Sequence, residues 1–158
     1  MTRVLGALAA VAVLAAAWFG WSWWSAAHDD GLVRARDRDA VIAAAGDALV
    51  ALNTIDYREA GAALDRWIAV TSGQLGSSLS GDRQGQVDRA TAGKLVATAS
   101  LRQIAVTELN GDAARVIAVL DVSIASGGGE PKPGRSHLTA DVARADGTWK
   151  ITAVQGAS

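Results

Sequence analysis

The chain has 158 residues, with 15 basic and 16 acidic side chains, a formal net charge of -1 and no cysteine. Charges of both signs alternate along the sequence, so no basic stripe is available for a phosphate backbone, and nucleic acid is not an expected partner. The missing cysteine excludes disulfides, thiolate catalysis and thiolate metal sites.

The first element is an uncharged apolar stretch from Val4 to Trp24. At about 1.5 Å per helical residue, roughly 20 residues span the ~30 Å hydrocarbon core of a bilayer. Its far end carries four of the six tryptophans, whose rings favour the headgroup level of a membrane: Trp18, Trp21, Trp23 and Trp24. We therefore expect residues 1–28 to form a short cytoplasmic tail and a transmembrane anchor in the lipid bilayer.

A cleaved signal peptide is the main alternative, because Arg3 precedes the stretch and the small residues Ser25 to Ala27 follow it. The apolar core of a signal peptide usually has 7 to 15 residues, whereas this stretch has about 21, which favours a retained anchor. Arg3 places the N-terminus inside, although three later arginines oppose that orientation: Arg34, Arg36 and Arg38. We expect a single-pass protein of the cell membrane with residues 29–158 outside.

Two helical patterns open this outer domain. Apolar residues recur at helical spacing from about Arg36 to Leu52, and Asn53-Thr54 interrupts them. A second amphipathic stretch follows: Tyr57, Ala60, Ala63, Leu64, Trp67 and Ile68. From Thr71 to Lys94 the chain is polar and rich in glycine, which predicts only short, weak helices.

Beta-branched residues dominate after Leu95 and predict a sheet. Asn110-Gly111 predicts a tight hairpin turn between strands 101–109 and 113–124, and Asp146-Gly147 predicts one between 137–143 and 149–154. Residues 126–134 form the longer loop between the hairpins. Helices followed by an antiparallel meander indicate an α+β domain, a cone in which helices close the concave face of a curved sheet.

The order of these features resembles the Mce-associated membrane proteins: an anchor, the segment Leu52 to Arg58, and a sheet that ends in Asp146 to Ile151. The resemblance implies an NTF2-like fold. It also implies a non-catalytic accessory or assembly subunit of an Mce-type importer in the cell envelope, with Mce transporter subunits as partners and a lipid or sterol as ligand. The alternative is a membrane-tethered NTF2-like module that binds a hydrophobic small molecule by itself.

NTF2-like cones also host enzymes, which need a carboxylate base in an apolar pocket and an oxyanion donor. Tyr57 is the only tyrosine, and the candidate bases are Asp56, Asp65 and Asp141. Adjacent residues do not share a helix face, so Asp56 and Tyr57 do not form such a pair. Tyr57 is better explained as a residue at the edge of the core, and we do not expect an enzyme.

His137 and Asp141 lie on one face of a predicted strand, where they could orient an imidazole or start a metal site. Zinc needs three or four ligands, so a surface histidine is the better interpretation, and we expect no metal or cofactor. Trp67 and Trp149 fit large core positions. Their alternative role, together with Tyr57, is to line a pocket or a partner surface.

Overall fold

The computed structural model describes residues 30–156. The chain divides into two compact units at Asp37, and the α+β fold belongs to the unit that begins at Arg38. No helix within residues 30–156 is long and apolar enough to cross a membrane. The predicted anchor, with its four tryptophans, lies outside the described residues.

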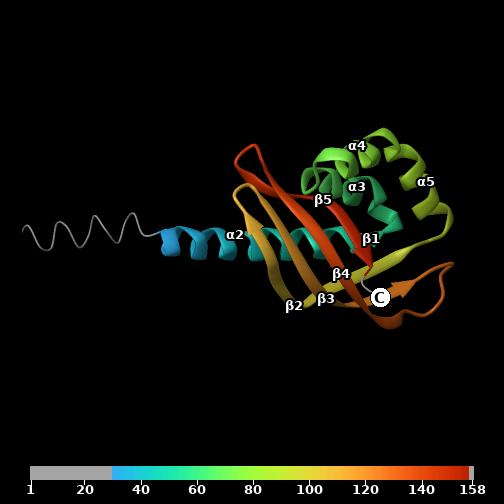
Figure 1. Cartoon of the computed structure of the whole chain (residues 1–158). Helices are drawn as coiled ribbons and strands as arrows, with labels where there is room; N and C mark the ends of the chain where they lie inside the picture. Colours follow the sequence, from blue (N-terminus) through green and yellow to red (C-terminus); the bar gives the residue numbers. More distant parts are fainter. Residues whose placement is uncertain (1–29, 157–158) are drawn as a thin grey trace, which may run out of the picture. The chain divides into compact units, whose positions relative to one another are not determined.

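The helices come first in the described chain and the long strands follow (Figure 1). The helical half contains α2 (Asp30–Leu52), the short strand β1 (Ile55–Asp56), the 3-10 helix η1 (Tyr57–Glu59), α3 (Ala60–Ala69), α4 (Gly73–Gly81) and α5 (Arg83–Ala92). The strands are β2 (Val96–Asn110), β3 (Ala113–Ala125), β4 (Lys132–Ala145) and β5 (Thr148–Gly156).

All five strands form one antiparallel sheet in the order β1-β2-β3-β4-β5. The β4–β5 turn has positive φ at both Asp146 and Gly147, as predicted for a primed turn. In the β2–β3 turn, Asn110 pairs with Ala113, and Gly111 is the residue with positive φ. The turn centre is therefore one residue later than predicted, because Asn110 completes the ladder.

The inner face of the sheet packs on α2. Buried residues of α2 recur every three or four positions and meet alternate residues of β3, β4 and β5. Gly46 of α2 lies close to β2, since an added Cβ would lie 2.9 Å from Cδ2 of Leu101. This main core contains Val41, Ala45, Ala48, Leu49, Ala114, Val116, Ala118, Leu120, Leu138, Ala140, Val142, Trp149 and Ile151.

Local hydrogen bonds explain why α2 ends at Leu52. The side chains of Asn53 and Thr54 donate to the carbonyls of Leu49 and Val50, both at 2.8 Å. These bonds satisfy two of the carbonyl groups that every helix leaves open at its C-terminus. The Asn-Thr break predicted from the sequence is thus a helix cap.

A second core lies between the helices and the start of β2. Its buried members come from β1, α3 and α5: Ile55, Ala60, Ala63, Leu64 and Ala90. Figure 1 shows α3, α4 and α5 grouped together, where α3 contacts both other helices and α4 contacts β5.

The predicted α+β class is confirmed, with helices packed on a five-stranded antiparallel sheet. Several boundaries differ from the sequence prediction. Strand β2 starts at Val96 and β4 at Lys132, each five residues earlier than predicted, so β4 begins inside the predicted loop. Helix α2 starts six residues before Arg36, Tyr57 belongs to η1 rather than to α3, and the glycine-rich segment forms two complete helices, α4 and α5.

Candidate functional site

The three aromatic residues predicted to line a pocket or partner surface lie in different places. Trp149, at 8% exposure, belongs to the main core. Trp67 is half-buried against the second core, and its Nε1 donates to the carbonyl of Ala51 at 2.8 Å. Tyr57 is also half-buried, with the guanidinium of Arg58 over its ring. Trp67 therefore ties α3 to the end of α2, and its role in partner binding stays a prediction, as do those of Tyr57 and Trp149.

The carboxylates considered as catalytic bases are each held by an arginine. Asp56 caps η1 through the amide of Arg58 at 2.9 Å and also pairs with its guanidinium. Asp65 accepts two hydrogen bonds from Arg83, at 2.8 and 2.9 Å, and this pairing lowers the pKa of the Asp65 carboxyl. A base for neutral pH needs a raised pKa, so Asp65 is poorly suited to that role.

His137 is exposed on β4, and Asp141 on the same face accepts a 2.7 Å hydrogen bond from Nε of Arg115. The carboxylate is thus engaged with Arg115. No group of three or more histidine, aspartate or glutamate residues could hold a metal ion within residues 30–156.

The outer face of the sheet, opposite the face that packs on α2, carries apolar and charged side chains in a regular arrangement. Along β3 the side chains of this face are Arg115, Ile117, Val119 and Asp121. An apolar centre is therefore bounded at each end by a charged residue. On the neighbouring strands, Ala105 of β2 pairs with Ile117, and the polar His137 of β4 pairs with Val119.

The two charged ends are opposite in sign. At one end Arg115 lies between two acids: it bonds to Asp141 and pairs with Glu108 at 3.4 Å. The bond to Asp141 is the main reason that the pKa of Arg115 is raised. This acidic triad (Glu108, Arg115 and Asp141) carries a formal charge of -1.

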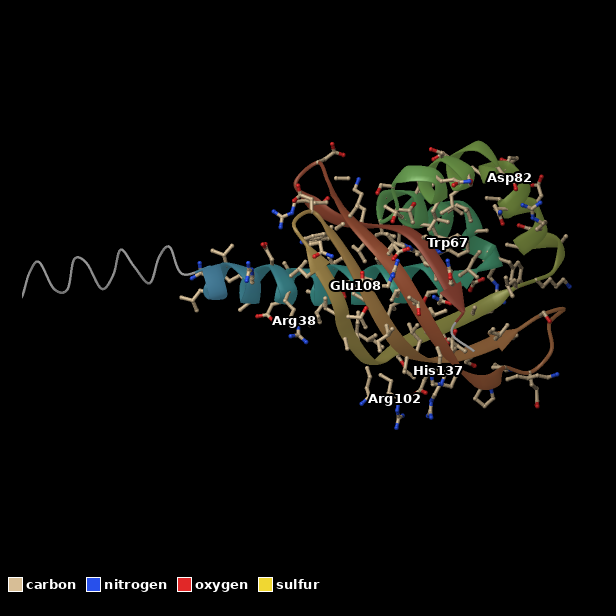
Figure 2. All side chains as sticks on the ribbon, in the orientation of Figure 1. Arg38, Trp67, Asp82, Arg102, Glu108 and His137 are labelled. Carbon is tan, nitrogen blue, oxygen red and sulfur yellow. The ribbon has the colours of Figure 1, made fainter. Side chains whose placement is uncertain are left out.

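At the other end Asp121 lies between two bases. It accepts hydrogen bonds from Arg135 at 3.0 Å and Arg102 at 3.1 Å, and these bonds lower the pKa of the Asp121 carboxyl. This basic triad (Arg102, Asp121 and Arg135) carries a formal charge of +1. Figure 2 shows that Arg102 and His137 point away from α3, α4 and α5.

An open hollow of about 480 Å³ lies between the triads. Ile117 lies in it with 47% of its surface exposed, beside Val119 and Ala105, and Gln103 and His137 add polar groups. An exposed apolar centre with a charged rim is typical of a protein-binding surface. This outer face is the candidate site that the structure adds, and we refer to it below as the outer face.

No protein-family model and no curated protein matches the sequence. Solved structures do resemble the fold. The periplasmic domain of DotI has a TM-score of 0.61 and 20% identity, covering 75% of this chain and 94% of that chain. An IcmL-like type IV secretion system protein from Legionella pneumophila has a TM-score of 0.60 and 13% identity, covering 76% and 91%.

CagV, a VirB8 homologue of the type IV secretion system of Helicobacter pylori, is also similar. Its TM-score is 0.58 and its identity 11%, with 76% of this chain and 98% of that chain covered. At these identities the likeness concerns the fold.

The predicted relationship to Mce-associated membrane proteins is wrong. The solved structures with similar folds include several type IV secretion proteins, and nothing found supports Mce. The predictions that followed from this relationship are wrong as well. They are the accessory role in an Mce lipid or sterol importer, its alternative of an independent hydrophobic-ligand module, the Mce partners and the lipid ligand. The motifs behind the prediction have local roles in this fold, since Asp56 caps η1 and Trp149 fills the core.

The outer face was not predicted from the sequence, although the alternating residues of β3 include its central row. Arg115, Ile117, Val119 and Asp121 follow one another at every second position, which places them on one side of a strand. The pairing of this row with Glu108, Asp141, Arg102 and Arg135 depends on strand register. That register cannot be derived from one strand alone.

Proposed function

We propose that the chain is a non-catalytic structural subunit of a type IV secretion or conjugation assembly in the cell envelope. Residues 1–28 would anchor it in the cytoplasmic membrane, with the N-terminus inside, and residues 29–158 would form an extracytoplasmic domain. The observation that carries the proposal is the likeness of this domain to the periplasmic domain of DotI over 94% of that chain.

Two further features support it. The uncharged segment Val4 to Trp24 precedes the domain, as an anchor would. The outer face offers an apolar centre between charged triads, which suits protein contact, whereas the candidate bases Asp56, Asp65 and Asp141 are all paired with arginines. The outer face is then the surface that contacts other subunits of the assembly.

The test uses the full chain in its native cells, with a photo-crosslinking amino acid at Ile117 in the outer face. Gln84, exposed on α5, is the matched control position. We expect crosslinks from position 117 to other secretion subunits and few from position 84. Ile117→Asp should lower substrate transfer at least tenfold at an unchanged protein level, and Gln84→Asp should leave transfer unchanged.

Affinity purification of the tagged full chain from native membranes gives the opposing outcome. If the chain comes out without any secretion subunit, and Ile117→Asp leaves transfer at the wild-type rate, the proposed function is wrong.

A further inference from the structure

The free edge of the sheet at β2 is a second surface, and it is independent of the proposed function. Strand β1 pairs with β2 only at Val96 and Ala97. From Thr98 to Asn110, β2 pairs with another strand only on its β3 side within the described residues. None of its 15 residues is fully buried. A long open edge presents unpaired N–H and C=O groups to any strand that fits it.

The sequence of this edge is chemically symmetric about Ala105. Reading outward in both directions, Ile104 mirrors Val106, Gln103 mirrors Thr107, Arg102 mirrors Glu108 and Leu101 mirrors Leu109. If two copies of β2 pair antiparallel with Ala105 opposite Ala105, each apolar residue meets an apolar one and each arginine meets a glutamate.

The side-chain faces have the same symmetry. Ile104 and Val106 both point inward, since they pair with the buried residues Ala118 and Val116. The ladder to β3 is irregular between Leu101 and Gln103 and again between Val106 and Glu108, so one irregularity lies on each side of Ala105. Each bulge shifts the alternation by one residue.

After these shifts the outer members of the symmetric set share faces as well. Leu101 and Leu109 both pair with buried residues of the inner face. Arg102 reaches Asp121 and Glu108 reaches Arg115, both on the outer face. Directly opposed residues of paired strands lie on the same face, so all of these pairs can meet across a two-fold axis.

We propose that β2 pairs with β2 of a second copy of this chain, in the antiparallel register centred on Ala105, to give one continuous sheet across a two-fold axis. Charged residues usually protect an edge from pairing with other strands. Here the charges favour one register, because only the register centred on Ala105 places Arg102 of each copy opposite Glu108 of the other. The axis places the two outer faces on the same side of the joined sheet.

Cysteine crosslinking of the full chain in membranes tests the register, since the wild-type chain has no cysteine. Opposed Cα atoms of antiparallel strands are about 4.5 or 5.5 Å apart, within the ~4.4–6.8 Å span of a disulfide. Under mild oxidation, most molecules of the Ala105→Cys variant should therefore form a covalent dimer. Ala153→Cys, the same change on the other edge strand β5, should stay monomeric. No dimer from Ala105→Cys, or equal dimer from both variants, would overturn the proposal.

Charge variants of the full chain in detergent give a second, reversible measurement. Arg102→Glu alone places glutamate opposite Glu108 twice in each dimer, and Glu108→Arg alone places arginine opposite Arg102 twice. We expect each to weaken self-association about fivefold or more. A mixture of the two variants restores both opposite-charge pairs and should form heterodimers with near wild-type affinity. Unchanged association of the single variants, or no recovery in the mixture, contradicts the register.

Discussion

The two edges of this sheet, along β5 and along β2 beyond its short pairing with β1, differ in how the chain covers them. The chain bridges β5 at Ile151, near the middle of the strand: the amide of Ser72 donates to the carbonyl of Ile151 at 2.9 Å, and the amide of Ile151 donates to the carbonyl of Val70 at 3.0 Å. Strand β2 has such cover only at its first two residues, from β1. The strand that carries buried core residues is thus bridged by its own chain at Ile151, near its middle, whereas β2, which carries none, has no such bridge beyond Ala97 within the described residues.

Burial follows the same division. On β5, Ile151 is fully buried and Trp149 nearly so, whereas β2 exposes most of its residues. An edge strand that carries core residues is held in place by that packing and here also by the bridge at Ile151. An edge at the margin of the core can stay open and take part in association.

The largest expected effect comes from breaking the core side of this contrast. Ile151→Ala on β5 removes a fully buried side chain and leaves a cavity, so we expect a loss of about 2–5 kcal/mol in the free energy of unfolding. Ile104→Ala on β2 removes the same atoms from a half-buried position and should cost clearly less. Urea unfolding of the full chain, followed by circular dichroism at low concentration, measures both. Equal losses would mean that the two edges contribute alike to the core.

A smaller effect is expected from the segment that covers β5. Thr71 is 4% exposed, and its hydroxyl donates to the carbonyl of Trp67 at 2.8 Å. Thr71→Val leaves this carbonyl without its donor and should cost about 1–3 kcal/mol.

Thr107 on β2 is the matched control, since its hydroxyl also donates to a backbone carbonyl, that of Arg115 at 3.1 Å, but at an exposed position. Thr107→Val should change stability by less than about 0.5 kcal/mol. The same unfolding experiment compares the two variants. If Thr107→Val costs as much as Thr71→Val, the edges do not differ in the way described above.

The fold class could be predicted from sequence because its signals are local. Helical spacing gave α2 and α3, and Asp146-Gly147 gave the second hairpin. Strand β1 was not predicted, since two residues carry no periodicity and depend on their pairing with Val96 and Ala97. The start of α2 at Asp30 was missed because its first turns lack the apolar spacing that marks the rest.

The candidate surfaces were harder to predict, because they depend on the order and register of strands. The symmetry about Ala105 is visible in the sequence, but it gains meaning only once β2 is known to be an edge. Asp56 caps a helical turn and Trp149 fills the core, and neither role is specific to one family. Motifs of this kind therefore indicated a family that the structural likeness does not support.

Amide hydrogen exchange on the wild-type full chain in detergent tests most directly whether β2 is the edge that associates. Measured at high and at low protein concentration, the amides between Thr98 and Asn110 that do not donate to β3 should exchange at least fivefold more slowly in the concentrated sample. The amides of β5, which takes no part in the proposed contact, should exchange equally in both. Exchange of β2 that does not depend on concentration, or slowing at β5 instead, would contradict the account.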